Sequence, residues 1–283
     1  MHHTENATTR RVGQAIATVI CDTKSGDSPR ITTLELVYPR FIHSEFMTHR
    51  MFSRNAASSR ATPVQRMIDE VAKNPVVPEV WRRNVAGMAG GEPLPPEKQA
   101  EARSEWMWAC QQALITAARL AELGVAKEHV NRVLEPFTRI RTLVTATEWE
   151  NFFNLRLADG VQPEMHDLAL AMKRAMDASE PRESKFHLPY VDLEGGAWPS
   201  ISDVKKSVAR CARVSYLTHE GSELNDAADL RLAERLLKSG HLSPFEHQAR
   251  AFDPYRFITN FKGWSSYRSS IESGLGSIFT QLP

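Results

Sequence analysis

The chain has 283 residues, of which 42% are hydrophobic and 24% are charged, values typical of a globular protein that buries a full core. Its net charge of +1 and its pI near 7.8 exclude a general nucleic-acid coat and a polybasic membrane anchor, so any positive site must be local. No apolar run approaches the roughly 18 residues that a spanning helix needs, and the N-terminus lacks the apolar stretch of a secretory signal. We therefore expect a cytoplasmic protein without a nucleic-acid or membrane partner.

Cysteine and histidine spacing indicates neither a disulfide frame nor a metal site. Cys21, Cys110 and Cys211 are scattered and odd in number, which fits a reduced interior. The 10 histidines show none of the familiar Cys/His zinc spacings, so no metal is expected.

The first third of the chain predicts a hairpin followed by a helix. Residues 14–22 and 31–38 have strand patterns, and the intervening KSGDSP has the composition of a turn. After Pro39 the apolar spacing becomes helical, for example Ile42 and Phe46. This spacing predicts a helix that ends near Asn55, before a loop of small residues.

The rest of the chain is predicted to be mainly helical. Residues 84–96 are rich in Gly and Pro and predict a loop, which a long helix over 96–124 follows. A second helix begins at Pro163, and its methionines are expected in the core. Residues 179–199 have the composition of a linker, and a helix over 226–239 follows it.

Residues 46–63, FMTHRMFSRNAASSRATP, combine positive charge and hydroxyl groups without an acidic residue. Arginine offers a planar fork of N–H donors, and serine hydroxyls and loop amides add neutral donors, which suits a phosphate or another oxyanion. An exposed basic helix end with a serine-rich turn has the same composition, so composition alone leaves both interpretations open. The side chains concerned are Arg50, Arg54, Arg60, Ser53, Ser58 and Ser59.

The order of these residues resembles the signature of flavin-dependent thymidylate synthases. In that family Arg-His-Arg is followed after seven residues by Ser, usually with Asn before the Ser and Arg two positions beyond it. The matching positions here are Thr48, His49, Arg50, Asn55, Ser58 and Arg60.

Two more segments are similar to the same family. NRVLEPF (131–137) and WENFFNLRLADGVQPEM (149–165) look like its downstream half, and SGHLSPFEH (239–247) matches its flavin-binding segment. The downstream matches are Arg132, Asn151, Arg156 and Gln162.

The segment order differs from the family's, since the PFEH segment normally comes first. A circular permutation accounts for this, because it requires only that the old termini lie close together. Residues 1–178 then carry the Arg-His-Arg-type segment and the downstream helical half, and 179–199 are the linker at the new join. Residues 200–283 carry the PFEH segment and the C-terminal tail, all within one folded unit.

The resemblance implies an α+β fold with an antiparallel sheet flanked by helices, and a homotetramer with FAD between subunits. It implies synthesis of dTMP from dUMP, with 5,10-methylenetetrahydrofolate as one-carbon donor and NADPH as reductant of the flavin. The nucleotide would contact Ser58, Ser59, Arg60, Arg132, Arg156 and Glu45, of which Arg156 and Ser58 are the implied catalytic residues. FAD would contact His49, Arg50, Asn55, His241, Ser243 and Glu246.

Several positions depart from the family pattern and keep alternatives open. Thr48 replaces the first Arg, Ala56 the usual acid and Glu45 the usual Gln. Thr145 and Thr147 stand where the family tends to place Asn and Arg for FAD. The alternatives are a dCMP or dUMP hydroxymethylase or methylase and a non-enzymatic flavin- or nucleotide-binding relative.

Some of the candidate residues have purely structural interpretations. Arg156 could be ion-paired on a helix, His241 and His247 could be capping or packed histidines, and Gln162 a structural hydrogen-bonder. The tail YRFITNFKGWSSYRSS (255–270) is expected to be a packed amphipathic helix, with a lid or a subunit contact as the other interpretations.

Overall fold

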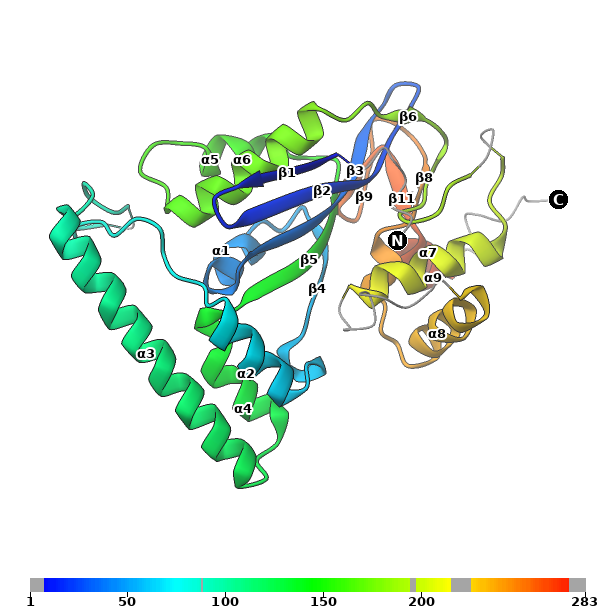
Figure 1. Ribbon diagram of the computed structural model, residues 1–283. Helices are drawn as coiled ribbons and strands as arrows, with labels where there is room; N and C mark the ends of the chain where they lie inside the picture. The colour runs from blue at the N-terminus through cyan, green and yellow to red at the C-terminus, as the bar shows by residue number, and fades with distance from the viewer. Residues whose placement is uncertain (1–7, 88, 194–196, 215–224, 275–283) are drawn as a thin grey trace.

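The computed structural model describes residues 8–87, 89–193, 197–214 and 225–274 (Figure 1). Its centre is an antiparallel sheet with strand order β1-β2-β3-β5-β4, and β6 pairs in parallel with β2. The strands are β1 (Thr9–Val12), β2 (Ala15–Ser25), β3 (Ser28–Pro39), β4 (Ser53–Ala56), β5 (Arg139–Ala146) and β6 (Arg182–Glu183). The expected antiparallel sheet is confirmed.

The predicted hairpin is β2 and β3, which pair antiparallel with Ile16 opposite Val37. Leu34, Leu36 and Tyr38 share one face of β3 and are completely buried, as their spacing predicts. Both strands extend further toward the turn than the sequence pattern indicates.

The predicted helix that ends near Asn55 is wrong. The 3₁₀ helix η1 (Arg40–Ile42) and α1 (His43–Met47) end before the basic stretch does, and residues 53–56 form β4. Pairing of β4 with the free edge of β5 supplies hydrogen bonds that a longer helix would lose. Phe46 and Phe52 are still both buried, and each packs against Phe152.

A layer of helices that includes α2, α3 and α4 lies at one end of the sheet and has its own apolar cluster (Figure 1). The long helix predicted over 96–124 is confirmed as Pro96–Glu122, and Gly124 ends it with a φ of +74°. Its side chains Cys110, Ala113 and Ala117 are buried. The elements of this layer are η2 (Ser59–Ala61), α2 (Val64–Lys73), α3 (Pro96–Glu122), α4 (Lys127–Leu134) and η3 (Glu135–Phe137).

The two faces of the central sheet are covered by different parts of the chain. Helix α6 (Pro163–Asp177), preceded by α5 (Glu150–Arg156), packs across β1 to β3 (Figure 1). Its methionines lie in that core as predicted, together with Leu34. The preceding residue of β3, Thr33, points to the other face and contacts His187 from the C-terminal part.

The C-terminal part contains a three-stranded sheet, β11-β8-β7, and a two-stranded pair, β10-β9. The expected linker 179–199 carries β6 and β7, and Phe186 within it is buried. The helix predicted over 226–239 is confirmed as α8. The remaining elements are β7 (Phe186–His187), α7 (Ile201–Arg213), α8 (Asp226–Lys238), η6 (Ser243–Glu246), β8 (Ala249–Ala251), β9 (Phe257–Ile258), β10 (Phe261–Lys262), β11 (Trp264–Ser266) and α9 (Tyr267–Ser273).

The tail over 255–270 contains three short strands, β9, β10 and β11, and only its last residues join α9. The expectation of a packed amphipathic helix is therefore wrong for 255–266. Trp264 explains the difference, because its completely buried ring and its Nε1–H donation to the Pro29 carbonyl (2.7 Å) fix the segment against β3.

None of the helices in the described ranges is long and apolar enough to cross a membrane.

Candidate functional site

His49 and Arg156 are in direct contact although they are 107 residues apart. The Nε–H of Arg156 donates to His49 Nε2 at 2.9 Å, and Arg156 Nη2 lies 3.4 Å from the Thr48 hydroxyl. Because the guanidinium only donates, His49 must carry its proton on Nδ1. Burial, followed by the charges of Arg156 and Arg54, lowers the pKa of His49 to about 4. The structure thus holds a neutral imidazole against a cation.

Arg54 fixes the turn that presents these groups. Its Nη1 donates to the carbonyl oxygens of Met47 (2.8 Å) and His49 (3.1 Å) from the first residues of β4. Burial lowers the pKa of Arg54, and the nearby charge of Glu246 counteracts this. Arg50 lies exposed in the same turn.

The PFEH segment lies beside this turn. Its 3₁₀ helix η6 packs against β4, and Glu246 forms an ion pair with Arg268 on α9. His241 and Ser243 are exposed, and His241 Nδ1 lies 2.8 Å from the Ser239 hydroxyl. The resemblance segments that are most distant in sequence are therefore neighbours in the fold.

A second group of predicted residues gathers where η2 meets α4. The side-chain amide of Asn131 donates to the carbonyls of Ser59 (2.8 Å) and Thr62 (2.9 Å), which anchors the serine-rich loop on α4. Ser58 and Arg60 are exposed on this loop. Arg132, on α4, is 62% exposed and donates to Glu135.

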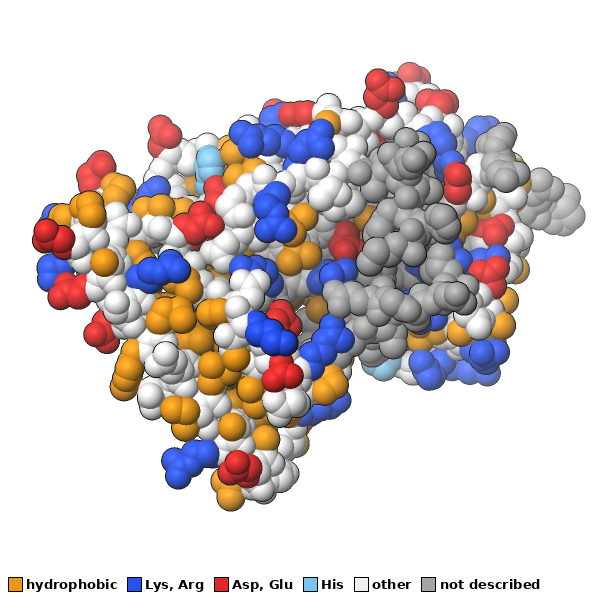
Figure 2. Space-filling view, in the orientation of Figure 1, with side chains coloured by type: hydrophobic (Ala, Val, Ile, Leu, Met, Phe, Trp, Pro, Cys, Tyr) orange, Lys and Arg blue, Asp and Glu red, His pale blue; other side chains and the backbone are white. Residues whose placement is uncertain are grey.

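No described contact joins Arg156 to this second group. Arg40 is linked to the second group, because it pairs with Glu135 at 3.5 Å and Glu135 also pairs with Arg132. His43 is linked to the first group by the charge of Arg54, which acts on its ring. Figure 2 shows Lys and Arg side chains gathered near the centre of this face, where Figure 1 places β4 and α2.

Four further candidate residues lie elsewhere, with the following contacts. Asn55 is buried and its side-chain amide donates to the Cys211 carbonyl at 2.8 Å, which ties β4 to α7. His247 is completely buried and its Nδ1 lies 2.8 Å from the Thr145 hydroxyl. Gln162 donates to Glu164 at 3.1 Å. Glu45 is exposed on α1 beside the Ser44 hydroxyl.

Sequence reasoning missed Tyr38, Arg40 and His43 as parts of this region. Arg40 is mostly buried, and its Nε has no hydrogen-bond partner among the described residues. Only the concentration of basic and aromatic residues just before the signature could have indicated them.

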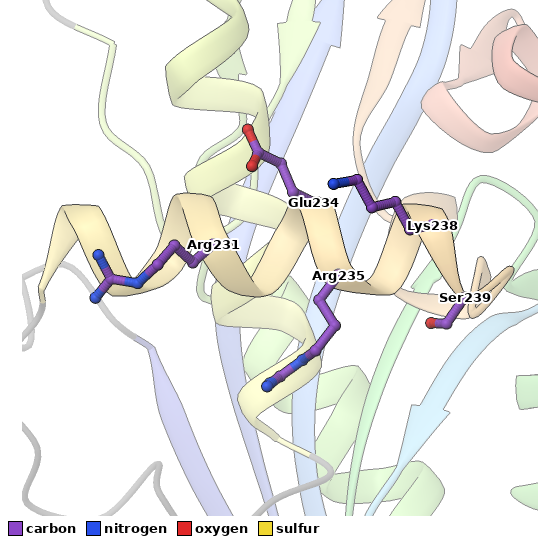
Figure 3. A pocket seen from close by; sticks show the side chains of 5 residues that line it. All are labelled: Arg231, Glu234, Arg235, Lys238 and Ser239. Atoms are coloured by element: carbon purple, nitrogen blue, oxygen red, sulfur yellow. The ribbon is translucent and has the colours of Figure 1, made fainter.

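A surface hollow on α8 is lined by side chains that do not converge. Figure 3 shows Arg231, Glu234 and Arg235 leaving the helix in different directions. The hollow ends at Ser239, next to the turn that carries His241.

The described part of the chain has neither a cluster of metal-binding side chains nor an activated cysteine thiol among Cys21 and Cys211. No cluster of three or more His, Cys, Asp or Glu side chains there is suited to hold a metal ion. Burial raises the pKa of the Cys21 thiol to about 11 and shifts that of Cys211 in the same direction, so both are protonated at neutral pH.

The family model described as Thy1, thymidylate synthase complementing protein, matches residues 31–182, more than half of the chain. The chain therefore belongs to this family, the flavin-dependent thymidylate synthases, and is an enzyme of the methyltransferase type. The matched range contains the Arg-His-Arg-type and downstream segments, and the PFEH segment lies outside it. No protein with a curated description matches the chain significantly.

Two solved structures are similar to parts of the chain, both of the UMP/dUMP methylase PolB from Streptomyces cacaoi. The form bound with 5-Br UMP has a TM-score of 0.48 at 16% identity, over 60% of this chain and 91% of that chain. The form bound with 5-Br dUMP has a TM-score of 0.42 at 22% identity, over 52% and 66%. Because both TM-scores lie below 0.5, neither carries a conclusion about activity.

Proposed function

We propose that this enzyme methylates C5 of the pyrimidine of dUMP to give dTMP, using 5,10-methylenetetrahydrofolate and NADPH as co-substrates and FAD as cofactor. The observation that carries the proposal is the contact between His49 and Arg156. It joins the Arg-His-Arg-type segment to the downstream segment, the two parts of the chain that resemble the family.

The residues near β4 fit the diphosphate of FAD. Arg50 and Arg54 supply positive charge in one turn, and Glu246 is the acid whose charge acts on Arg54. Because Arg268 already pairs with Glu246, the turn keeps a net positive charge that suits an anion. His49, Arg50, His241, Ser243 and Glu246 would hold the cofactor, which supplies the reducing equivalents when bound.

The nucleotide would be held by the second group. Ser58, Arg60 and Arg132 are exposed donors around one loop–helix junction, which suits a phosphate monoester. Arg156 would stabilise negative charge that develops on the pyrimidine ring, and its contact with neutral His49 orients the guanidinium without neutralising it.

A homotetramer completes this proposal, because the resemblance implies FAD between subunits. In such an assembly the two groups can face one ligand from different subunits. The packing of η6 against β4 supports the circular permutation, since it places the PFEH segment beside the Arg-His-Arg-type segment.

Product analysis tests the proposal directly. The purified protein, incubated with NADPH, methylenetetrahydrofolate and dUMP, should be yellow and should form dTMP. His49→Ala and Glu246→Ala should lower flavin content and leave the fold intact, whereas His166→Ala on α6 should keep the flavin. Full FAD content in both site variants would remove the cofactor assignment.

Glu45 supports a second candidate, a dCMP-specific enzyme. A carboxylate accepts hydrogen bonds and welcomes the amino group at C4 of cytosine, but it repels the C4 carbonyl of uracil. Glu45 lies exposed on α1, and its carbonyl accepts from Thr48, a residue of the His49–Arg156 contact. In the other interpretation Glu45 restores the acid that Ala56 lacks, and dUMP remains the substrate.

A competition assay that compares turnover of dUMP and dCMP, in the natural protein and in Glu45→Gln, distinguishes these two interpretations of Glu45. A dCMP preference that collapses in Glu45→Gln would assign base choice to this carboxylate, because a group that hydrogen-bonds the C4 amino group of cytosine is left unpaired when uracil binds. A dUMP preference in both proteins would exclude the cytosine candidate.

A further inference from the structure

His43 has a fixed position that no sequence motif explains. It begins α1, and its Nδ1 lies 2.8 Å from the hydroxyl oxygen of Tyr38. That oxygen is also 3.1 Å from the Thr142 hydroxyl on β5. Because Tyr38 is completely buried, two strands of the central sheet hold the imidazole in place.

Charged groups from three other elements act on this ring. They are Arg40 on η1, Arg54 on β4 and Glu135 on η3. Burial, then Arg40 and Arg54, lower the pKa of His43, and Glu135 only partly opposes them. No described residue hydrogen-bonds to His43 Nε2. The ring is therefore a neutral imidazole with a free edge, within electrostatic range of two arginines.

We propose that His43 is a further residue of the anion-binding site, and that its Nε2 contacts the phosphate of the bound nucleotide and takes up a proton on binding. This inference rests on the proposed function for the nature of the anion. It assigns to the site a residue that matches no family motif. The ring of His43 is in the field of Arg54 from the first group and of Glu135, the ion-pair partner of Arg132 from the second group.

The charge balance of the site explains the proton uptake. Without an anion, two guanidiniums oppose a third positive charge on His43. A bound phosphate adds negative charge, which favours the imidazolium and makes Nε2–H a charge-assisted donor. Proton uptake then reports that His43 lies beside the anion.

The contacts of the ring tolerate both protonation states. When His43 is neutral, the Tyr38 hydroxyl can donate to Nδ1 and accept from Thr142. When His43 is protonated, Nδ1–H donates to the Tyr38 oxygen, and the Tyr38 hydroxyl turns to donate to Thr142. Protonation therefore leaves no buried donor without an acceptor.

Calorimetry of dUMP binding in buffers of different ionisation enthalpy tests the inference, because it counts protons taken up. The unchanged protein should gain a fraction of a proton on binding, beyond any change of the nucleotide itself. His43→Gln should abolish this uptake and weaken binding by about tenfold, the cost of one charge-assisted bond. His166→Gln, on α6, should change neither quantity. Equal proton uptake in the unchanged protein and in His43→Gln would overturn the proposal.

Tyr38→Phe separates the positioning of the His43 ring from its charge. This variant keeps the packing of the aromatic ring and removes the hydroxyl oxygen that contacts His43 Nδ1. It should reduce affinity less than His43→Gln and retain part of the proton uptake. Retention of full affinity and full uptake in Tyr38→Phe would contradict the positioning by Tyr38.

Sulfate distinguishes this inference from the proposed function, because sulfate does not titrate near neutral pH. If sulfate binds with proton uptake that depends on His43 while dUMP does not bind, the nucleotide assignment fails and the anion site stands. If dUMP binds without such uptake, the inference about His43 fails alone. If neither anion binds, both fail.

Discussion

Burial, and after it the charges of neighbouring arginines, lower the pKa values of two histidines in this enzyme. His49 accepts a hydrogen bond from Arg156, and His43 lies within the field of Arg40 and Arg54. Both imidazoles are therefore neutral, and both can respond when an anion changes the local balance. The clustered arginines therefore add to burial in holding both histidines unprotonated.

Replacing Arg156 with Gln tests the contact at this scale. The pKa of His49 should rise from about 4 toward the ordinary 6.5, because a nearby positive charge is lost. The rise should be partial, since burial is the larger cause and Arg54 remains. Titration of the imidazole Cε1 proton by NMR measures it. An unchanged pKa would show that the guanidinium does not act on this ring.

Replacing Arg60 with Ala tests the nucleotide group. One charge-assisted hydrogen bond is worth about 1.5–3 kcal/mol, so dUMP affinity should fall roughly ten- to a hundredfold. Arg119→Ala, an exposed arginine on α3, is the matched control and should bind normally. Equal affinity in both variants would place Arg60 outside the site.

At the level of elements, the local sequence pattern was sufficient to predict a helix where the segment has a single apolar periodicity. Helix α3 was predictable because Pro96 starts it and Gly124 stops it, and α6 because its methionines repeat on one face. Strand β4 was not predictable, because its local spacing is helical and its strand form depends on β5, far along the chain. The same dependence hid the ion pair of Arg40 with Glu135 and the effect of Arg54 on His43, which exist only when β3, η3 and β4 come together.

The turn between β1 and β2 lies against carboxylates from α6 and from Glu79. These close carboxylates allow a test of how pH affects stability. Gly13 has a φ of +50°, and a Cβ there would clash with Asp167 Oδ2 and lie 3.1 Å from Glu79 Oε1. Glu164, next to Asp167 in the same pocket, is 6% exposed. Although Glu79 is an exposed residue, partial burial of its carboxylate and then the charges of Asp167 and Glu164 raise its pKa.

Glu79→Gln should therefore raise the melting temperature at pH 7. The folded protein holds the Glu79 proton more tightly than the unfolded chain does. Stability from this group is complete below its ordinary pKa and is lost as the pH rises through the raised one. Thermal unfolding at pH 4 and pH 7 measures this, and the advantage of the variant should vanish at pH 4. A lower melting temperature at pH 7 would show that Glu79 stabilises the turn.

At the scale of the whole molecule, buried histidines join the C-terminal part to the central sheet. His187 contacts the hydroxyls of Thr23 (2.9 Å) and Thr33 (2.7 Å), and Thr33 contacts Thr145 (2.6 Å). Thr145 in turn contacts His247 Nδ1 at 2.8 Å. This hydrogen-bonded series runs from the segment expected as a linker, through the central sheet, to the PFEH segment.

The molecule should therefore lose stability in mild acid. Burial, as the largest cause, lowers the pKa of His187 and of His247 to about 3 each. The unfolded chain protonates both below about 6.5, so their contribution is complete above that pH and is lost as the pH falls toward 3. Each histidine should then cost about 1.4 kcal/mol per pH unit in this window. Urea unfolding at pH 7, 6 and 5 measures the slope while most carboxylates remain ionised.

The variant His247→Gln isolates this effect from the other histidines with lowered pKa values, His43 and His49. It should reduce the pH slope of the free energy of unfolding by about 1.4 kcal/mol per pH unit, and His187→Gln should do the same. The matched control His129→Gln should leave the slope unchanged, since the His129 side chain is 72% exposed. If a buried variant does not fold, NMR titration of both imidazoles in the unchanged protein replaces it. Protonation of either ring near pH 6.5 in the folded protein would refute a neutral pair between the PFEH segment and the central sheet.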